Sequence, residues 1–265
     1  MTDTDRPGPP RRRTASAVLW PMLGLSVTIG AWWTATTVFA VNTVVLPSPP
    51  DVLDGFQRYR GLLVAETWHT TVAAALGFAL SAIAGVLIGT AIAAWRPFER
   101  MFSPLLVAFN AVPKVALAPL MLIWFGYGRT PVLAMAFMVC FFPIVLSTAV
   151  GLTTTPADLA ELARSVNATR WQTFRWVRLP AALPQMFVGL RVAMPLAVIG
   201  VVVGEMQYGE TGLGMIIVQT SGQGDTATAF TAITLLAVVS IVLYYLLLMV
   251  ERLALPWVRA TTSAR

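Results

Sequence analysis

Residues 67–95 read TWHTTVAAALGFALSAIAGVLIGTAIAAW and contain no Asp, Glu, Lys or Arg. A helix needs about 20 consecutive apolar residues to cross the roughly 30 Å hydrocarbon core of a bilayer. The run is long enough for that. It is also too long and too uniformly apolar to be one of the strands of a membrane barrel, which are about ten residues long and alternate in polarity. The stretch therefore predicts a transmembrane helix over residues 70–94.

Five further runs of the same kind predict five more spans. Three of them are free of charged residues, and two contain one charge each, Lys114 and Arg191. The predicted spans are 17–40, 102–125, 131–152, 182–204 and 229–250. Over the 265 residues, 57% are hydrophobic and 11% are charged, whereas a soluble domain carries about 25% charged residues. The composition excludes a soluble enzyme and a disordered chain, and the expected fold is an all-α polytopic membrane protein with six transmembrane helices.

The distribution of arginine predicts the orientation of these spans. With six helices, thirteen arginines fall on the side that holds both termini and three on the other side. Because positively charged loops stay in the cytoplasm, we expect both termini to be cytoplasmic in a bacterial plasma membrane. Residues 1–16 are expected to be a disordered cytoplasmic tail. The run over 17–40 exceeds the 7–15 residues of a signal-peptide core, which favours a permanent anchor helix.

Cysteine and histidine are too few for metal or disulfide chemistry. The chain has one cysteine, Cys140, and one histidine, His69, so we expect no disulfide, no metal site, no cofactor and no catalytic residue. The basic residues lie between the apolar runs and do not form one patch. We therefore expect the chain to lie in a lipid bilayer, with these charges in the loops between its spans, and we do not expect it to bind nucleic acid.

The loop between the fourth and fifth spans, residues 153–181, reads TTTPADLAELARSVNATRWQTFRWVRLPA. Thr155 and Pro156 suit the start of a helix, and Asn167 stands where this helix should stop because Asn tolerates a positive φ. A second helix is expected from Thr169, ended by Leu179-Pro180 before the fifth span. The loop therefore predicts a hairpin of two short helices on the cytoplasmic side.

This loop resembles the EAA loop of ABC importer permeases. The family pattern is Glu-Ala-Ala, three residues, Gly, nine residues, Ile, one residue and Leu-Pro. Here Leu162 replaces the first Ala and Asn167 replaces the Gly, while the remaining positions match in register or conservatively. The resemblance implies that the loop couples the permease to an ATPase through Glu161, Ala163, Asn167, Ala168, Trp171, Val177, Leu179 and Pro180.

Other segments extend the resemblance over about residues 45–255. Leu46-Pro47-Ser48-Pro49 before a short amphipathic segment, Ala118-Pro119-Leu120 and Gly204-Glu205-Met206 followed by Gly212-Leu213-Gly214 are similar to the nitrate, sulfonate, taurine and thiamine-precursor branch. The resemblance implies the type I importer (MetI-like) permease fold over residues 62–255, with a re-entrant piece within 207–224. It also implies a second permease copy in a homodimer, two ATPase subunits and an extracytoplasmic solute-binding protein. The implied solute is a small anion such as a sulfonate, taurine or nitrate, or a thiamine-precursor pyrimidine.

Lys114 and Glu205 are the candidate residues of the translocation pathway. A charge inside a span is costly and marks a functional site by default, and Lys114 would suit an anionic solute. Two alternatives for Lys114 stay open: it pairs with Glu205, or its side chain reaches out to water. Glu205 lies either at the outer mouth or in water, and Arg191 is expected to form a structural ion pair.

Small residues recur at four-residue intervals in the second span, at Gly77, Ser81, Gly85 and Gly89. Residues at this spacing share one helix face and let a neighbouring backbone approach closely. The stripe either packs against a helix of the same subunit or lines the pathway between two copies.

Other function classes lack their motifs. A phosphate-binding Gly-x-x-x-x-Gly-Lys-Ser/Thr loop does not occur, so the chain is not the ATPase. Neither His-Glu-x-x-His nor Gly-x-Ser-x-Gly occurs, which excludes the intramembrane hydrolases that use them. A stand-alone, ion-coupled secondary carrier remains the alternative function, and an interfacial hairpin without a partner remains the alternative for the loop.

Overall fold

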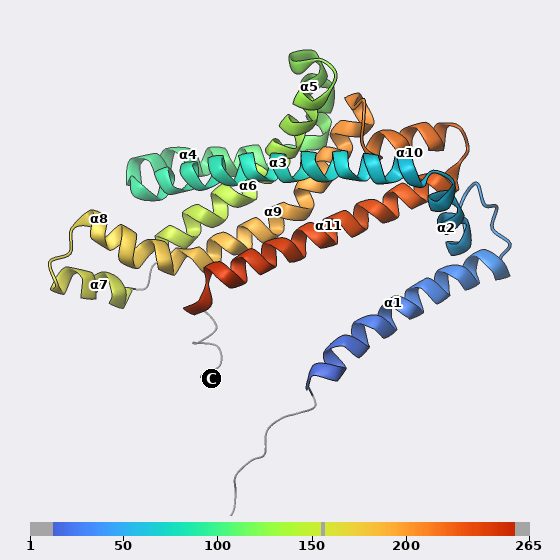
Figure 1. Ribbon diagram of the computed structural model, residues 1–265. Helices are drawn as coiled ribbons and strands as arrows, with labels where there is room; N and C mark the ends of the chain where they lie inside the picture. Colours follow the sequence, from blue (N-terminus) through green and yellow to red (C-terminus); the bar gives the residue numbers. More distant parts are fainter. Residues whose placement is uncertain (1–12, 155–156, 258–265) are drawn as a thin grey trace, which may run out of the picture.

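Four long helices form the body of the computed structural model, which describes residues 13–154 and 157–257 (Figure 1). These helices are long and apolar enough to cross a membrane. They run alongside one another, and every regular element within the described ranges is helical. They are α3 (Arg60–Ala94), α6 (Arg129–Thr153), α9 (Leu179–Tyr208) and α11 (Thr226–Ala254). An all-helical, multi-span membrane protein is therefore confirmed.

Helix α6 is the centre of the bundle and packs closely on α3 and on α9. A Cβ atom added at Gly85 of α3 would lie 2.9 Å from Cγ2 of Ile144, and one added at Gly200 of α9 would lie 2.7 Å from Cα of Ala136. Within lipid, helices associate through close packing because tails and side chains are equally apolar. Small residues therefore hold these three helices together.

The span predicted over 102–125 is not one straight helix. The chain forms α4 (Arg96–Ala111), the 3-10 turn η1 (Lys114–Leu117) and α5 (Ala118–Phe125), with a bend of 82° between the two halves. Pro113 has no N–H to continue the helix, and it holds Val112 in an extended conformation with ψ of 127°. Helix α5 accordingly projects away from the bundle (Figure 1). Counted as one broken span, this pair brings the helices that are long and apolar enough to cross a membrane to five among the described residues.

Most of the N-terminal helix α1 (Arg13–Val38) lies apart from the bundle (Figure 1), and only its C-terminal part approaches α11, where the ring centroids of Trp32 and Phe230 are 6.5 Å apart. Helix α1 begins at Arg13, and residues 1–12, most of the tail that is expected to be disordered, lie outside the described part. After a short connection, α2 (Pro49–Arg58) is the expected amphipathic segment. Its start is fixed by Asp51, whose Oδ2 accepts from the backbone N–H of Ser48 at 2.8 Å.

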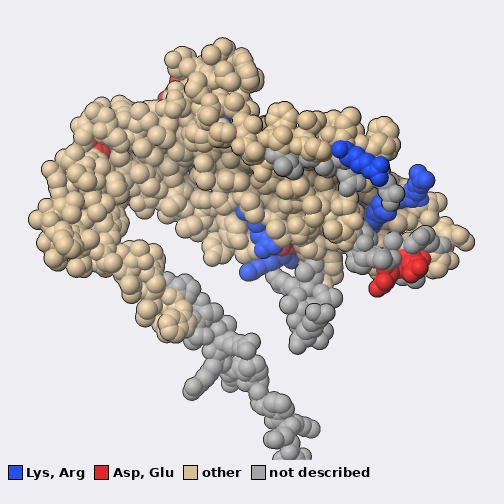
Figure 2. Space-filling view, turned by 180° about the vertical axis from the view of Figure 1, so that it is seen from behind, with Lys and Arg blue, Asp and Glu red and all other residues tan. Residues whose placement is uncertain are grey.

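Helix α3 is longer than predicted, since it begins ten residues before position 70. Glu66 ended the charge-free run and so hid this extension, yet its side chain is buried inside the protein. The short apolar helix α10 (Leu213–Gly222) packs against α9 and α11. Figure 2 shows basic side chains gathered towards the end of the molecule that carries residues 157–178, and a large uncharged surface over much of the remaining face. This arrangement is typical of a protein embedded in a bilayer.

Candidate functional site

The hairpin between α6 and α9 consists of α7 (Ala157–Ser165), a tight turn and α8 (Arg170–Thr173). Asn167 adopts the expected left-handed conformation with φ of 52°. The N–H of Ala168 donates to the carbonyl of Ala163 at 3.0 Å, which closes the end of α7 as a Schellman motif. Thr169 then caps α8, because its hydroxyl accepts from the N–H of Gln172. The helix start expected at Thr155 and Pro156 lies outside the described residues.

The hairpin presents exposed side chains that contact little of the chain itself. Trp171 is 69% exposed and Trp176 is 74% exposed. Glu161 is exposed and has no ion pair or hydrogen bond among the described residues, whereas Ala163 is buried against the hairpin. Large exposed aromatic residues are typical of a surface that binds another protein.

The prediction that Leu179-Pro180 ends the second hairpin helix is wrong. From α8 the chain continues through the π-helical segment η2 (Phe174–Arg178) into α9, as one helix over Arg170–Tyr208. The N–H of Leu179 donates to the carbonyl of Phe174, five residues earlier. A wider turn accommodates Pro180, which lacks an N–H and would otherwise clash with the carbonyl four residues before it. The hairpin is consequently continuous with a membrane span, and Val177 lies within the π-helical segment.

At the other end of α9, side chains of α3 and α9 bind the first N–H groups of α10. The Gly212 N–H donates to Oε2 of Glu66, the Leu213 N–H to the Thr70 hydroxyl at 2.9 Å, and the Gly214 N–H to Oε2 of Glu205 at 2.9 Å. The Thr70 hydroxyl in turn donates to Oε1 of Glu205 at 2.8 Å. Carboxylates are favourable at a helix N-terminus, where free N–H groups carry partial positive charge. This cluster fastens α10 to two membrane spans.

The three acceptor side chains of this cluster are almost completely buried. Glu66 is 8% exposed, Thr70 is fully buried and Glu205 is 3% exposed. Of the two alternatives for Glu205, the one that places its side chain in water is therefore wrong. The role of Glu66 was missed, because the residue reads only as the polar border of an apolar run. The one available signal is its position four residues before Thr70, on the same face of a helix.

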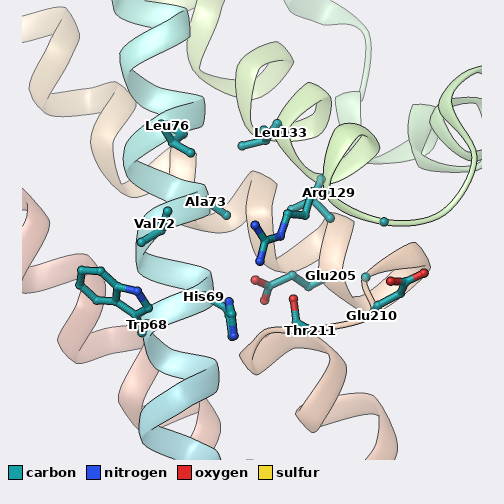
Figure 3. Close-up of a pocket in the computed structure, with 13 residues that line it drawn as sticks. Trp68, His69, Val72, Ala73, Leu76, Arg129, Leu133, Glu205, Glu210 and Thr211 are labelled. Carbon is teal, nitrogen blue, oxygen red and sulfur yellow. The ribbon is translucent and has the colours of Figure 1, made fainter.

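A pocket of about 330 Å³ lies beside this cluster, between α3, the start of α6 and the segment after α9 (Figure 3). Its apolar wall comes from α3 and α6. Its aromatic and polar lining residues are Trp68, His69, Arg129, Glu205, Glu210 and Thr211. The Arg129 guanidinium and the Glu205 carboxylate point toward each other, yet Arg129 has no ion pair or hydrogen bond within the described part of the chain.

The structure does not bring Lys114 and Glu205 together. The Nζ of Lys114 donates to the backbone oxygen of Asn110 at 2.9 Å and to its Oδ1 at 3.1 Å. It also lies 5.3 Å from the ring centroid of Phe142. Lys114 is thus held by its own broken span, and the alternative in which it pairs with Glu205 is wrong.

Arg191 of α9 forms the expected structural ion pair, with Glu251 of α11. Its Nε lies 3.2 Å from Oε2 of Glu251. The positive charge of α9 and the negative charge of α11 thereby neutralise each other where the two helices pack.

The small-residue stripe faces α6 of the same chain. A Cβ atom at Gly77 would overlap the side chain of Ala136, and one at Gly89 would lie 2.7 Å from Cβ of Thr148. The Ser81 hydroxyl donates to the carbonyl oxygens of Gly77 and Phe137. This face of α3 is therefore occupied within the subunit.

Comparison with known proteins agrees with these features. Residues 81–259 match the family described as the binding-protein-dependent transport system inner membrane component. The chain is 38% identical over 254 residues to the riboflavin transport system permease protein RibX of Chloroflexus aurantiacus, covering 94% of this chain and 95% of that protein.

A second relative is the formylaminopyrimidine transport permease protein ThiX of Halalkalibacterium halodurans, 33% identical over 226 residues, which cover 85% of this chain and 90% of the relative. The fold resembles that of the MetNI methionine ABC transporter in an inward-facing conformation, with a TM-score of 0.64 and 21% identity over 74% of this chain and 97% of that one. The predicted resemblance is confirmed: the chain belongs to the inner-membrane permease subunits of binding-protein-dependent ABC importers.

Proposed function

We propose that the protein crosses the membrane six times, with α1 as the first span and the bent pair α4–α5 as the third. Helix α1 has 26 residues and is uniformly apolar after its first residue apart from hydroxyl groups and glycine. Exposed arginines of the hairpin segment, including Arg170, Arg175 and Arg178, support a cytoplasmic position for that segment, because positively charged loops stay in the cytoplasm. Both termini then lie in the cytoplasm, and α10 and the pocket face outward.

As a family member, the protein works with an ATPase and a solute-binding protein, and hydrolysis of ATP takes place on the ATPase. The proposed complex contains two copies of this chain, each with residues 62–255 as the permease domain, and two ATPase subunits. In each copy the hairpin docks into a groove of one ATPase subunit. The observation that carries this proposal is the exposed hairpin, which continues into α9 as one helix over Arg170–Tyr208 and leaves the Trp171 side chain 69% exposed.

The proposed cargo is a small solute delivered by the binding protein, and a nitrogen heterocycle is favoured over a small anion. Both relatives reported above are named for heterocycles, riboflavin and formylaminopyrimidine. Lys114, which would favour an anion, is held by Asn110 and Phe142 and lies outside the outer pocket. The anion alternative would be supported if nitrate, taurine or a sulfonate stimulated transport.

Reconstitution separates the importer from an ion-coupled carrier. The permease, its ATPase and its binding protein are placed in liposomes, and ATP hydrolysis and solute uptake are measured. The importer requires that loaded binding protein stimulates hydrolysis and that uptake stops without ATP. Uptake that follows an ion gradient in the absence of the ATPase would establish the carrier instead.

A further inference from the structure

The pocket beside the α10 cluster has the dimensions of a small-molecule site. Its volume is about 330 Å³, and ligand pockets range from about 300 to 1,000 Å³. One wall is apolar and consists of aliphatic residues from α3 and α6, including Val72, Leu76 and Leu133. An ion as small as nitrate would leave most of this wall uncovered. A ligand with an apolar body would cover it and is therefore the better complement.

The charges at the pocket do not favour an anion. Two carboxylates, Glu205 and Glu210, line it together with one guanidinium, that of Arg129. Two oxygens of Glu205 already accept hydrogen bonds from Thr70 and Gly214, but each carboxylate oxygen can accept a further one. With two carboxyl groups against one guanidinium, the lining offers an anionic ligand no excess of positive charge, whereas an uncharged ligand with both donors and acceptors can pair with both kinds of group.

The Arg129 guanidinium and the Glu205 carboxylate determine which polar groups such a ligand needs on its edge. Arg129 offers only donors and Glu205 only acceptors, and the two groups point toward each other across the pocket without forming an ion pair (Figure 3). A ring whose edge carries adjacent C=O and N–H groups satisfies both at once. Trp68 and His69 add aromatic surface along α3, on which a flat ring can pack.

We propose that this pocket binds the ring of an uncharged nitrogen heterocycle, with Arg129 donating to an acceptor on the ring edge, a carbonyl oxygen or a ring nitrogen, and Glu205 accepting from an adjacent N–H. The inference rests on the proposed function, since the ligand is the solute handed over at the outer face. Arg129 is then a specificity-determining residue of the permease, and the pocket selects the solute in addition to the binding protein.

The test uses the permease–ATPase complex in lipid nanodiscs without the binding protein, and riboflavin as a fluorescent probe. Riboflavin binds saturably, its emission is quenched near Trp68, and excess formylaminopyrimidine displaces it, whereas excess taurine or nitrate does not. Arg129→Gln weakens riboflavin binding about tenfold or more, as expected for a hydrogen bond from a charged donor. Arg58→Gln, the same change at an exposed arginine of α2 outside this pocket, leaves binding unchanged.

Each contrary outcome overturns the inference. Absence of saturable binding, displacement by taurine or nitrate, or equal affinity of Arg129→Gln and the wild type would each show that the pocket is not this site. Stimulation of ATP hydrolysis by loaded binding protein is measured in the same preparation. If the stimulation is present and the heterocycle does not bind, the importer function stands and only the assignment of the pocket fails.

Discussion

Asn167 shows which residue roles a sequence can reveal. Its left-handed conformation, with φ of 52°, depends only on its own chain neighbours, and local chemistry therefore predicts it. Glu66 could not be found in the same way, because the Gly212 N–H that it accepts belongs to a residue 146 positions away. The role of a polar residue at the border of an apolar run depends on what the fold brings to it.

Substitutions at Asn167 should separate backbone conformation from side-chain chemistry. Asn167→Gly keeps the left-handed conformation accessible, so binding of the ATPase should stay at the wild-type level. Asn167→Val should cost about 1–2 kcal/mol or more, because a β-branched residue is strongly disfavoured at positive φ. Co-purification of the ATPase measures both. Equal recovery with both variants would show that the turn does not determine docking.

Glu205 should be needed for stability as well as for the pocket. Glu205→Ala leaves the Gly214 N–H and the Thr70 hydroxyl buried without this acceptor. Each unsatisfied buried group costs about 1–3 kcal/mol. Because 1 kcal/mol lowers the unfolding temperature of a chain of this size by about 2–4 °C, that of the purified permease should fall by about 4 °C or more. Glu210→Ala removes an exposed carboxylate from the same segment and should change it by no more than about 1 °C. Similar shifts for the two variants would contradict the account of α10.

At the scale of elements, hydropathy predicts helices well and their breaks poorly. The runs over 131–152 and 229–250 correspond to α6 and α11, because a long apolar run in lipid must satisfy its own backbone groups as a helix. The run over 102–125 is equally apolar, but Pro113 interrupts it. Conversely, Pro180 was expected to end a helix, and the π-helical segment before it keeps that helix continuous. A proline thus breaks or merely widens a helix according to the packing around it.

Helix packing at Gly200 should tolerate no side chain. Gly200→Val places new atoms against the backbone of α6, because even the first added atom, the Cβ, would lie 2.7 Å from Cα of Ala136. Overpacking of this kind costs about 1–3 kcal/mol or more, and α6 and α9 cannot separate without disrupting the bundle. The folded yield after solubilisation measures the effect. Gly24→Val in α1, where no atom lies within 4 Å of the added Cβ, is the matched control and should give the wild-type yield.

At the scale of the whole molecule, the charge distribution predicted a membrane protein with the hairpin at one end, and the structure has this arrangement (Figure 2). The separation of α1 from the bundle was not predictable, since an apolar run does not reveal whether it packs on its own chain, on a second copy or on lipid. The hydropathy and charge pattern of one chain likewise does not reveal its contacts with other subunits. The sequence therefore predicts membrane insertion better than assembly.

The proposed orientation can be read from labelling of single cysteines in intact cells. Ser221→Cys at the end of α10 should react with a membrane-impermeant maleimide, and Val166→Cys in the hairpin should react only after the cells are opened. Both parent residues are exposed, and the native Cys140 is buried and should stay unlabelled. Labelling of the hairpin cysteine from outside would contradict the orientation of all spans.

The central claim is that the hairpin of this permease is where the ATPase binds, and site-specific photo-crosslinking tests it most directly. A photoreactive amino acid is placed at Trp171 of the hairpin or at Trp124 of α5, two exposed aromatic positions, in cells that also produce the ATPase. Irradiation should join the chain to the ATPase from position 171 and not from position 124. Absence of the adduct at 171, with the ATPase present and the permease inserted, would contradict the account.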